Sequence, residues 1–299
     1  MKKILLLLLV IIVFGGMLFA AYKISAPTVA KKEPASQKIK ITTSFYPLYF
    51  LASEIGRDLV EVTNITPPGA EPHDYEITTQ DIFNMKSSKL LVITGNLETW
   101  APKIEESLSG TTTIILSVGD VASDKTDPHF WLSPKEFALA ADKITQSLLI
   151  LDPTNKDIYL QNAKILNKRL LGLDAKLKTG LANCETRDLV TSHDAFGYLA
   201  NEYGLRQVSI AGISTEEEPS LKKLAEVAQF AREYKIKYIF FESLLSPKLS
   251  ETIATEVGAM TMVLNPLEGL TDGEIRAGFN YITIMEDNLA NLKIALQCQ

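Results

Sequence analysis

Three histidines are the residues of this 299-residue chain with the greatest capacity for chemistry, and the sequence contains no others. Each lies in a turn-like segment beside an acidic residue or a proline: His73 in GAEPHDYE, His129 in TDPHFWLSP and His193 in TSHDAFGYLA. A lone histidine is more often a surface or core residue than a ligand. Three imidazoles brought together, however, suit a borderline divalent metal ion such as zinc, with one oxygen donor as the fourth ligand.

The fourth ligand of such a site would be a carboxylate. Asp74, Asp127 and Asp194 neighbour the histidines, but carboxylates in such positions more often accept a hydrogen bond from the imidazole, or cap a helix, than bind the metal. Glu268, in VLNPLEGLT, lies on a loop directly after a predicted strand at residues 261–264. Glu268 is therefore our candidate for the fourth ligand, and the alternative interpretation is a solvated loop carboxylate.

For the histidines to meet, the strands that precede them must end at the same edge of the predicted sheets. From residue 38 onward short apolar runs alternate with helical stretches, which predicts parallel sheets covered by helices. Beyond a first strand in IKITTSF, the predicted strands are residues 60–65, 90–93, 113–116, 188–191, 207–210, 238–241 and 261–264. His73 and His193 each follow a predicted strand, and His129 precedes a helix that starts near residue 134. Because ligands bind at the carboxyl edge of open α/β sheets, all three can reach one crevice.

A long helix divides the chain. Between residues 134 and 182 two helical stretches are separated only by LDPTN, and the second would be about 40 Å long at 1.5 Å per residue. We predict an α/β fold of two lobes, each a parallel sheet flanked by helices, joined by one long rigid helix, with the metal site in the crevice between the lobes. The predicted divisions are an amino-terminal lobe at residues 38–150, the linking helix at 151–183 and a carboxy-terminal lobe at 184–299. No internal repeat of fixed period is visible.

The amino terminus predicts export. Residues 4–22 carry no charge and follow Lys2 and Lys3, which is typical of a signal sequence or an amino-terminal membrane anchor, assigned here to residues 1–22. The run lacks an A-x-A cleavage site, which favours an uncleaved anchor. Residues 23–37 have the composition of a flexible tether. We therefore expect an extracytoplasmic protein tethered to the cell membrane.

The net charge limits the kinds of partner that we expect, and the cysteine content limits the possible disulfides. The 36 acidic and 30 basic residues give a net charge of -6, so we expect no basic surface for nucleic acid. Cys184 and Cys298 are the only cysteines. In an exported protein they can form a disulfide, but spacing alone leaves two unpaired thiols as an alternative, because bridging requires Cα atoms within roughly 7 Å of each other.

At these residues the sequence resembles the metal-binding solute-binding proteins of bacterial ABC importers for zinc and manganese, a group that includes zinc-uptake proteins and adhesin-like streptococcal lipoproteins. The resemblance covers residue 38 to the carboxyl terminus and is carried by GAEPHDYE, GNLETW, DPHFWLSP, SHDAFGYLANEYGL and NPLEGLT. It implies two α/β lobes held by a rigid long helix, in agreement with the periodicity. It also implies zinc as the ion, because manganese-type members usually place glutamate where His193 stands, and it implies Glu268, or else a water molecule, as the fourth ligand.

Three further comparisons with that family concern segments outside the ligands. Many zinc-type relatives carry a long His/Asp-rich loop before the second histidine site, whereas LSVGDVASDKTDPHF is short and has no extra histidine. Gram-positive relatives often have a lipobox cysteine, which is absent after the apolar run here. The final ALQC resembles relatives that end in a cysteine, which implies pairing of Cys298 with Cys184.

The function implied by the resemblance is capture of zinc and its delivery to a membrane ABC permease, by a protein that is not an enzyme and that is monomeric by default. One alternative is binding of manganese or another divalent metal within the same family. Another is a zinc-dependent hydrolase, because three histidines with an open position can lower the pKa of bound water to about 7. Glu268 would close that position, and no HExxH motif occurs. Cell adhesion, suggested by the relatives' names, has no recognisable chemistry in the sequence.

Overall fold

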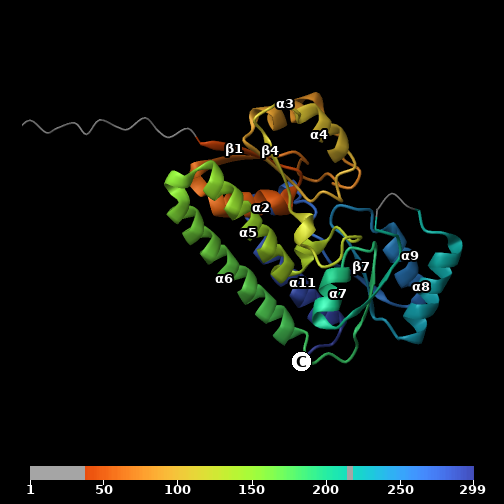
Figure 1. The fold of residues 1–299 in the computed structure, drawn as a ribbon. Coiled ribbons are helices and arrows are strands. Elements are labelled where there is room, and N and C mark those ends of the chain that lie inside the picture. The colour runs from red at the N-terminus through yellow and green to blue at the C-terminus, as the bar shows by residue number, and fades with distance from the viewer. Residues whose placement is uncertain (1–37, 214–217) are drawn as a thin grey trace, which may run out of the picture. The chain divides into compact units, whose positions relative to one another are not determined.

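A computed structural model describes residues 38–213 and 218–299 (Figure 1). The predicted signal sequence or anchor at residues 1–22 and the predicted tether at 23–37 lie outside the described residues. Across the described ranges, no helix is both long and apolar enough to cross a membrane. Lys38–Gln299 forms one compact unit by its internal contacts.

The amino-terminal lobe contains a four-stranded parallel sheet with the order β2-β1-β3-β4. Its strands are β1 (Ile39–Thr43), β2 (Val60–Asn64), β3 (Leu90–Ile93) and β4 (Ile114–Ser117). The connections contain the helices α2 (Tyr46–Gly56), α3 (Thr79–Ser87) and α4 (Ala101–Leu108) and the 3₁₀ turns η1 (Arg57–Leu59) and η2 (Gly119–Val121). Every residue of β3 is buried, as expected for a central strand with helices on both faces of the sheet.

The carboxy-terminal lobe repeats this arrangement with the order β6-β5-β7-β8, again parallel throughout. Its strands are β5 (Asp188–Thr191), β6 (Arg206–Ser209), β7 (Tyr238–Phe241) and β8 (Met260–Val263). Its helices are α7 (Gly197–Tyr203), α8 (Leu221–Glu233), α9 (Lys248–Val257), α10 (Asp272–Arg276) and α11 (Tyr281–Ala295). The two sheets thus share one strand order, although the sequence shows no repeat of fixed period.

Two long helices form a hairpin that follows the first sheet and precedes the second along the chain. They are α5 (Pro134–Leu151) and α6 (Lys156–Gly180), separated by the 3₁₀ turn η4 (Pro153–Asn155). Ser133 accepts a hydrogen bond from the backbone N–H of Glu136, and Pro134 follows it at the first helical position, so α5 begins with two start signals. Pro153 disfavours helical geometry at the preceding residue, which agrees with the end of α5 at Leu151.

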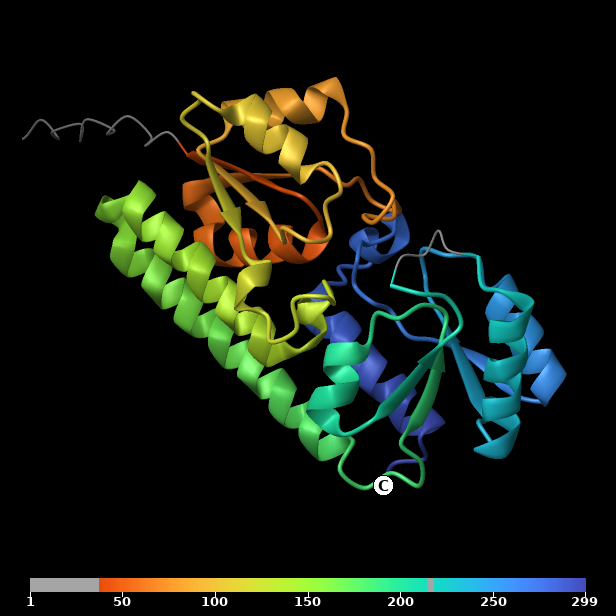
Figure 2. The same cartoon turned by 45° about the vertical axis from the view of Figure 1, so that its right-hand side comes forward.

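Helix α6 contacts both lobes. Near its start, the Asn162 side chain donates to the backbone carbonyl of Ile55 in α2, at 2.9 Å. Near its end, the hydroxyl of Tyr203 in α7 donates to the buried Asp174 carboxylate, at 3.0 Å. Figures 1 and 2 both show α6 running alongside the two lobes. At 25 residues it is about 37 Å long, enough to reach from one lobe to the other.

The largest hydrophobic cluster belongs to both lobes. It joins side chains of α2, α5, α6 and α11, and its largest fully buried members include Trp131, Phe137, Tyr159 and Tyr281. Two smaller clusters each serve one lobe alone. Since side chains in a close-packed core resist displacement, the shared cluster holds the lobes in one relative position.

The predicted fold class is confirmed: two α/β lobes with parallel sheets flanked by helices, and one long helix. The predicted second long helix is α6, whose 25 residues lie within the range 151–183 assigned to the linking helix. The lobe boundaries at residues 150 and 183 stay a prediction.

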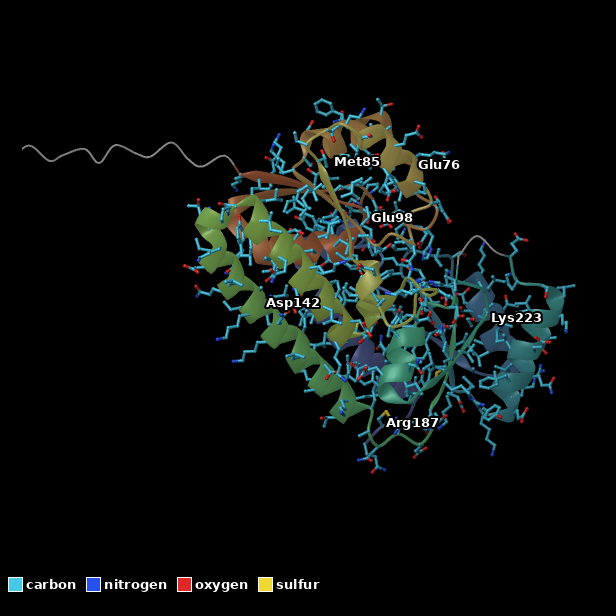
Figure 3. The ribbon with its side chains drawn as sticks, viewed as in Figure 1. Glu76, Met85, Glu98, Asp142, Arg187 and Lys223 are labelled. Atoms are coloured by element: carbon cyan, nitrogen blue, oxygen red, sulfur yellow. A yellow bond between two sulfur atoms is a disulfide. The ribbon has the colours of Figure 1, made fainter. Side chains whose placement is uncertain are left out.

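A disulfide joins Cys184 to Cys298, as predicted. Cys184 follows α6 and Cys298 follows α11, so the bond ties the end of the long helix to the end of the chain. The side chain of Arg187 (labelled in Figure 3) donates to the carbonyls of Leu181 and Ala182 in the same turn. This corner is therefore held by a covalent bond and by hydrogen bonds.

We predict that replacing both cysteines with serine lowers the free energy of unfolding by about 2–4 kcal/mol, because the cross-link restricts the unfolded chain over a sequence separation of 114 residues. Urea unfolding of the oxidised protein and the double variant measures the difference. The oxidised protein treated with a reductant serves as the control and is expected to match the variant. Equal urea midpoints for all three samples would show that the bond contributes nothing to stability.

Candidate metal centre

Each candidate side chain lies on a loop that begins at the carboxyl end of a strand. His73 follows β2, His129 follows β4 and precedes the 3₁₀ turn η3 (Phe130–Leu132), His193 follows β5, and Glu268 follows β8. Both sheets therefore supply loops to one place. This is the edge at which open α/β sheets bind their ligands.

The loop of His73 is attached to the loop of Glu268. Gly69 has a φ of 79°, a left-handed conformation that a side chain would strain, and its N–H donates to the carbonyl of Leu270 at 2.9 Å. The backbone N–H of His73 points to Glu71 Oε1, at 3.4 Å. The positions of His73 and Glu268 are thus coupled through the main chain.

His129 is fully buried, and its ring is held from two sides. One oxygen of Asp127 accepts from the backbone N–H of His129 at 2.9 Å and lies 2.7 Å from its Nδ1. The Trp131 ring packs against the imidazole, with centroids 5.2 Å apart, and its Nε1 donates to the carbonyl of Pro266 at 2.7 Å. Trp131 therefore links the loop of His129 to the loop of Glu268.

His193 is fully buried at the end of β5. Its carbonyl accepts from the Thr191 hydroxyl at 2.8 Å and from the Gln207 amide at 3.0 Å. Its Nδ1 lies 2.5 Å from Oε1 of Glu242, which is also buried. With Nδ1 engaged in this way, Nε2 points to the other histidines.

The Glu268 loop contains a strained residue. Leu267 is buried and has a φ of 63°, which a non-glycine residue adopts only where its surroundings enforce it. Its N–H donates to Asn265 Oδ1 at 2.7 Å. The Asn288 amide in α11 in turn forms two hydrogen bonds with the Asn265 backbone, at 2.9 and 2.7 Å. This buried network holds Glu268 towards the histidines.

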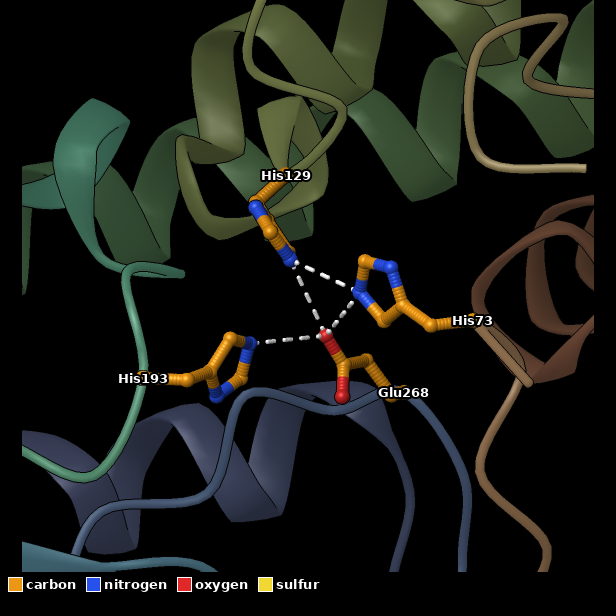
Figure 4. A group of neighbouring side chains, drawn as sticks. All are labelled: His73, His129, His193 and Glu268. Atoms are coloured by element: carbon orange, nitrogen blue, oxygen red, sulfur yellow. Dashed lines mark hydrogen bonds and ion pairs between the residues drawn. The ribbon is translucent and has the colours of Figure 1, made fainter. Parts of the chain in front are cut away.

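Together, the four side chains converge on one point (Figure 4). Oε1 of Glu268 lies 3.1 Å from Nε2 of His73, 3.1 Å from Nε2 of His129 and 3.4 Å from Nε2 of His193. The Nε2 atoms of His73 and His129 are 3.1 Å apart. All four ligand atoms lie within 4.8 Å of one another.

These separations match a four-coordinate metal site. Ligand atoms placed about 2 Å from a central cation in a tetrahedron are about 3.3 Å from one another. Three imidazole nitrogens and one carboxylate oxygen form a donor set suited to borderline divalent ions. Within the described residues, these four are the group of His, Cys, Asp and Glu side chains close enough together to hold a metal ion.

The electrostatics of the site also favours a positive charge at this point. Burial opposes a charge on His193, but the carboxylates of Glu268 and Glu242 outweigh burial and raise the pKa of His193 to about 11. Burial likewise opposes a charge on Glu268, yet the neighbouring histidines hold its pKa well below its usual range. For His129, hydrogen bonds to Asp127 and Glu268 overcome burial and raise the pKa. A bound cation would replace these protons as the partner of Glu268.

All four residues singled out from the sequence are thus brought together, and the acidic neighbour Asp127 has the predicted supporting place. Asp127 accepts hydrogen bonds from the backbone N–H and the ring of His129. Asp127 therefore belongs to the surroundings of the site.

The sequence analysis missed two carboxylates near the site, those of Glu242 and Glu71. Glu242 contacts His193, and Glu71 has an Oε2 that is buried without a hydrogen-bond partner among the described residues. Burial, together with the charge of Glu268, raises the pKa of Glu71 to about 9. Glu242 directly follows the predicted strand at residues 238–241, so the strand-end criterion that selected Glu268 also applies to it.

We predict that Asn288→Ala lowers the free energy of unfolding by about 2–4 kcal/mol, because it removes two buried hydrogen bonds. It is also expected to weaken divalent-metal binding, because the Glu268 loop loses its support. Thermal unfolding and metal titration measure the two effects. Asn291→Ala is the matched control, since Asn291 lies on the same helix but bonds to Val263 in β8. Equal metal affinity in both variants would show that the network does not position Glu268.

Known proteins are similar in sequence to this chain over most of its length. The family described as "ZnuA: Zinc-uptake complex component A periplasmic" matches residues 41–295. The chain is 36% identical over 293 residues to the high-affinity zinc uptake system protein ZnuA of Bacillus subtilis, covering 91% of this chain and 92% of that protein. It is 35% identical over 285 residues to the zinc-binding lipoprotein AdcA of Streptococcus pneumoniae, covering 88% of this chain but 57% of that protein. The chain thus spans less than two thirds of the length of this streptococcal relative.

A solved structure shares the fold. It is the Zn(II)-bound ZnuA-like domain of Streptococcus pneumoniae AdcA, with a TM-score of 0.78 and 37% sequence identity. The match covers 87% of this chain and 99% of that domain. The part of AdcA that this chain resembles is therefore one complete domain.

Proposed function

The chain belongs to the family of the zinc-uptake complex component A, ZnuA, and on that premise we propose that it captures zinc outside the cytoplasm and delivers it to a membrane ABC permease for import. The observation that carries the proposal is the convergence of three imidazole nitrogens and one carboxylate oxygen within 4.8 Å. The proposed ligands are His73, His129, His193 and Glu268.

The donor set favours zinc over manganese. Zinc accepts four tetrahedral nitrogen and oxygen ligands, whereas manganese prefers more oxygen donors and a higher coordination number. Two relatives carry names that agree with this choice: the Bacillus subtilis protein is named for zinc uptake, and the pneumococcal domain was solved with Zn(II) bound. Zinc is here the cargo of the protein.

The same geometry supports a carrier over a hydrolase. A catalytic zinc site keeps a coordination position open for water. Here the protein supplies all four donors, and the side chains of His129 and Glu268 are wholly inaccessible to solvent. His73 is the most exposed of the four, with 7% of its side-chain surface accessible. Such closed coordination stabilises bound zinc and leaves no place for a reacting water.

We propose that the protein works as a monomer on the outer side of the membrane, tethered by residues 1–22. A single chain supplies the complete ligand set, so capture requires no second copy. The family description "periplasmic" and the lipoprotein name of the pneumococcal relative support an extracytoplasmic, membrane-attached protein. The disulfide is also typical of exported proteins.

We predict that the full-length chain, purified in a mild detergent, binds about one zinc ion tightly and that His193→Ala weakens this binding by more than about 100-fold. That loss exceeds the usual effect of removing a residue that only supports a ligand. Glu268→Gln is expected to weaken binding as well, because it replaces an anionic donor with a neutral amide. Competition with a chelator of known affinity measures all three proteins.

Manganese titration and assays of ester and phosphate hydrolysis complete this test. Tighter binding of manganese than of zinc would favour the alternative cargo. Zinc-dependent turnover would favour the hydrolase. Absence of stoichiometric metal from the parent protein would overturn the proposed function itself.

A further inference from the structure

The strand register places Glu242 level with His193. In the parallel pair β5 and β7, Val190 is the partner of Ile239. Three residues further along each strand, at the carboxyl edge of the sheet, stand His193 and Glu242. Neighbouring parallel strands therefore bring these two residues side by side, although 49 positions separate them in the sequence.

Glu242 forms its hydrogen bonds through a single oxygen. Oε1 lies 2.5 Å from Nδ1 of His193 and also accepts from the Ser192 hydroxyl. The residue is 2% exposed, and its Oε2 has no hydrogen-bond partner among the described residues. A buried carboxylate oxygen left without a partner destabilises the fold, so Glu242 has properties that stability alone does not explain.

The chemistry of this contact determines which nitrogen of His193 is free. When zinc binds at Nε2, the remaining ring proton of His193 is carried by Nδ1, where the Glu242 carboxylate accepts it. Nε2 is the atom that faces Glu268 and the other histidines. We infer that Glu242 is a positioning residue that holds His193 in the zinc-binding tautomer and makes its Nε2 a stronger donor. This inference rests on the proposed function and deepens it.

A second histidine of the site has a similar support. Asp127 lies 2.7 Å from Nδ1 of His129, but its side chain is 15% exposed and it also accepts from a backbone N–H. Glu242 is buried in the other lobe and bonds to no backbone N–H in the described structure. The contact with His193 is therefore the main interaction of Glu242. A substitution of Glu242 thus tests how a carboxylate affects the metal-binding strength of the His193 imidazole.

Strengthened imidazole donors also affect the choice of metal. Zinc binds nitrogen ligands more strongly than manganese does, and manganese depends more on oxygen ligands. A loss of donor strength at His193 is therefore expected to weaken zinc binding more than manganese binding. A purely structural role of Glu242 would weaken both to the same degree.

Glu242→Gln in the full-length chain tests the inference, because glutamine keeps the size of the side chain but can present an N–H to Nδ1. The expected result is a loss of zinc affinity of about 10-fold or more, with a smaller loss for manganese. Glu98→Gln is the matched control. Glu98 (Figure 3) is also buried and follows a strand, β3, but it accepts hydrogen bonds from the backbone of Thr94 and Gly95 instead of from a histidine.

The outcomes separate this inference from the proposed function. A parent protein that does not bind zinc refutes the proposed function. A parent that binds zinc while Glu242→Gln binds it equally well, or loses zinc and manganese in equal proportion, overturns the inference alone. The Glu98→Gln control is expected to retain the parent's affinity for both ions.

A spectroscopic measurement on the parent keeps the inference testable if Glu242→Gln does not fold. Nitrogen-15 NMR of the zinc-loaded chain is expected to show protected Nδ1 protons for two histidines, and Asp127→Asn identifies the signal of His129. The remaining signal belongs to His193 if Glu242 accepts its proton. Absence of that second protected proton from the zinc-loaded parent would contradict the inference.

Discussion

The mutual approach of three imidazole nitrogens and one carboxylate oxygen in a buried place is the interaction on which the rest of the structure depends. Removing these groups from water is unfavourable unless a positive charge lies between them. The surrounding loops must therefore hold the four side chains together whether a metal cation or the histidine protons supply that charge. The hydrogen bond from Gly69 to Leu270, the bond from Trp131 to Pro266 and the Asn288 network provide this restraint, and each involves the segment on either side of Glu268.

The two sheets serve this interaction through their shared strand order. Each presents the carboxyl ends of its strands, and loops from both halves are needed to complete the ligand set. Helix α6 and the hydrophobic cluster shared by both lobes fix the distance between the lobes. The packing of the whole molecule therefore determines the geometry of the ligands. Short loops alone could not hold donors from two sheets at separations of 3.1–3.4 Å.

Local sequence pattern was a more reliable guide to the central strands than to the edge strands. The central strands β3, β5 and β7 have the predicted bounds, and each is centred on buried apolar residues. The edge strands β4, β6 and β8 are each shifted by one residue, and Ile114 and Met260 at their starts are exposed, so apolar character there does not mark the strand. Glu242 was missed for a different reason: its contact with His193 depends on which strands are neighbours in the sheet, and strand order leaves no signal in a local window.

The hydrophobic cluster shared by both lobes limits how far the conformations of the loaded and empty protein can differ. A wide hinge opening would tear apart a close-packed interior that includes Trp131, Phe137 and Tyr281. On the proposed function, the loaded and empty forms would then present nearly the same surface to the permease. Discrimination between them falls to the few loops around the site, so the transporter would have to sense local stiffness and local charge, and an empty carrier would compete with a full one for the same docking place.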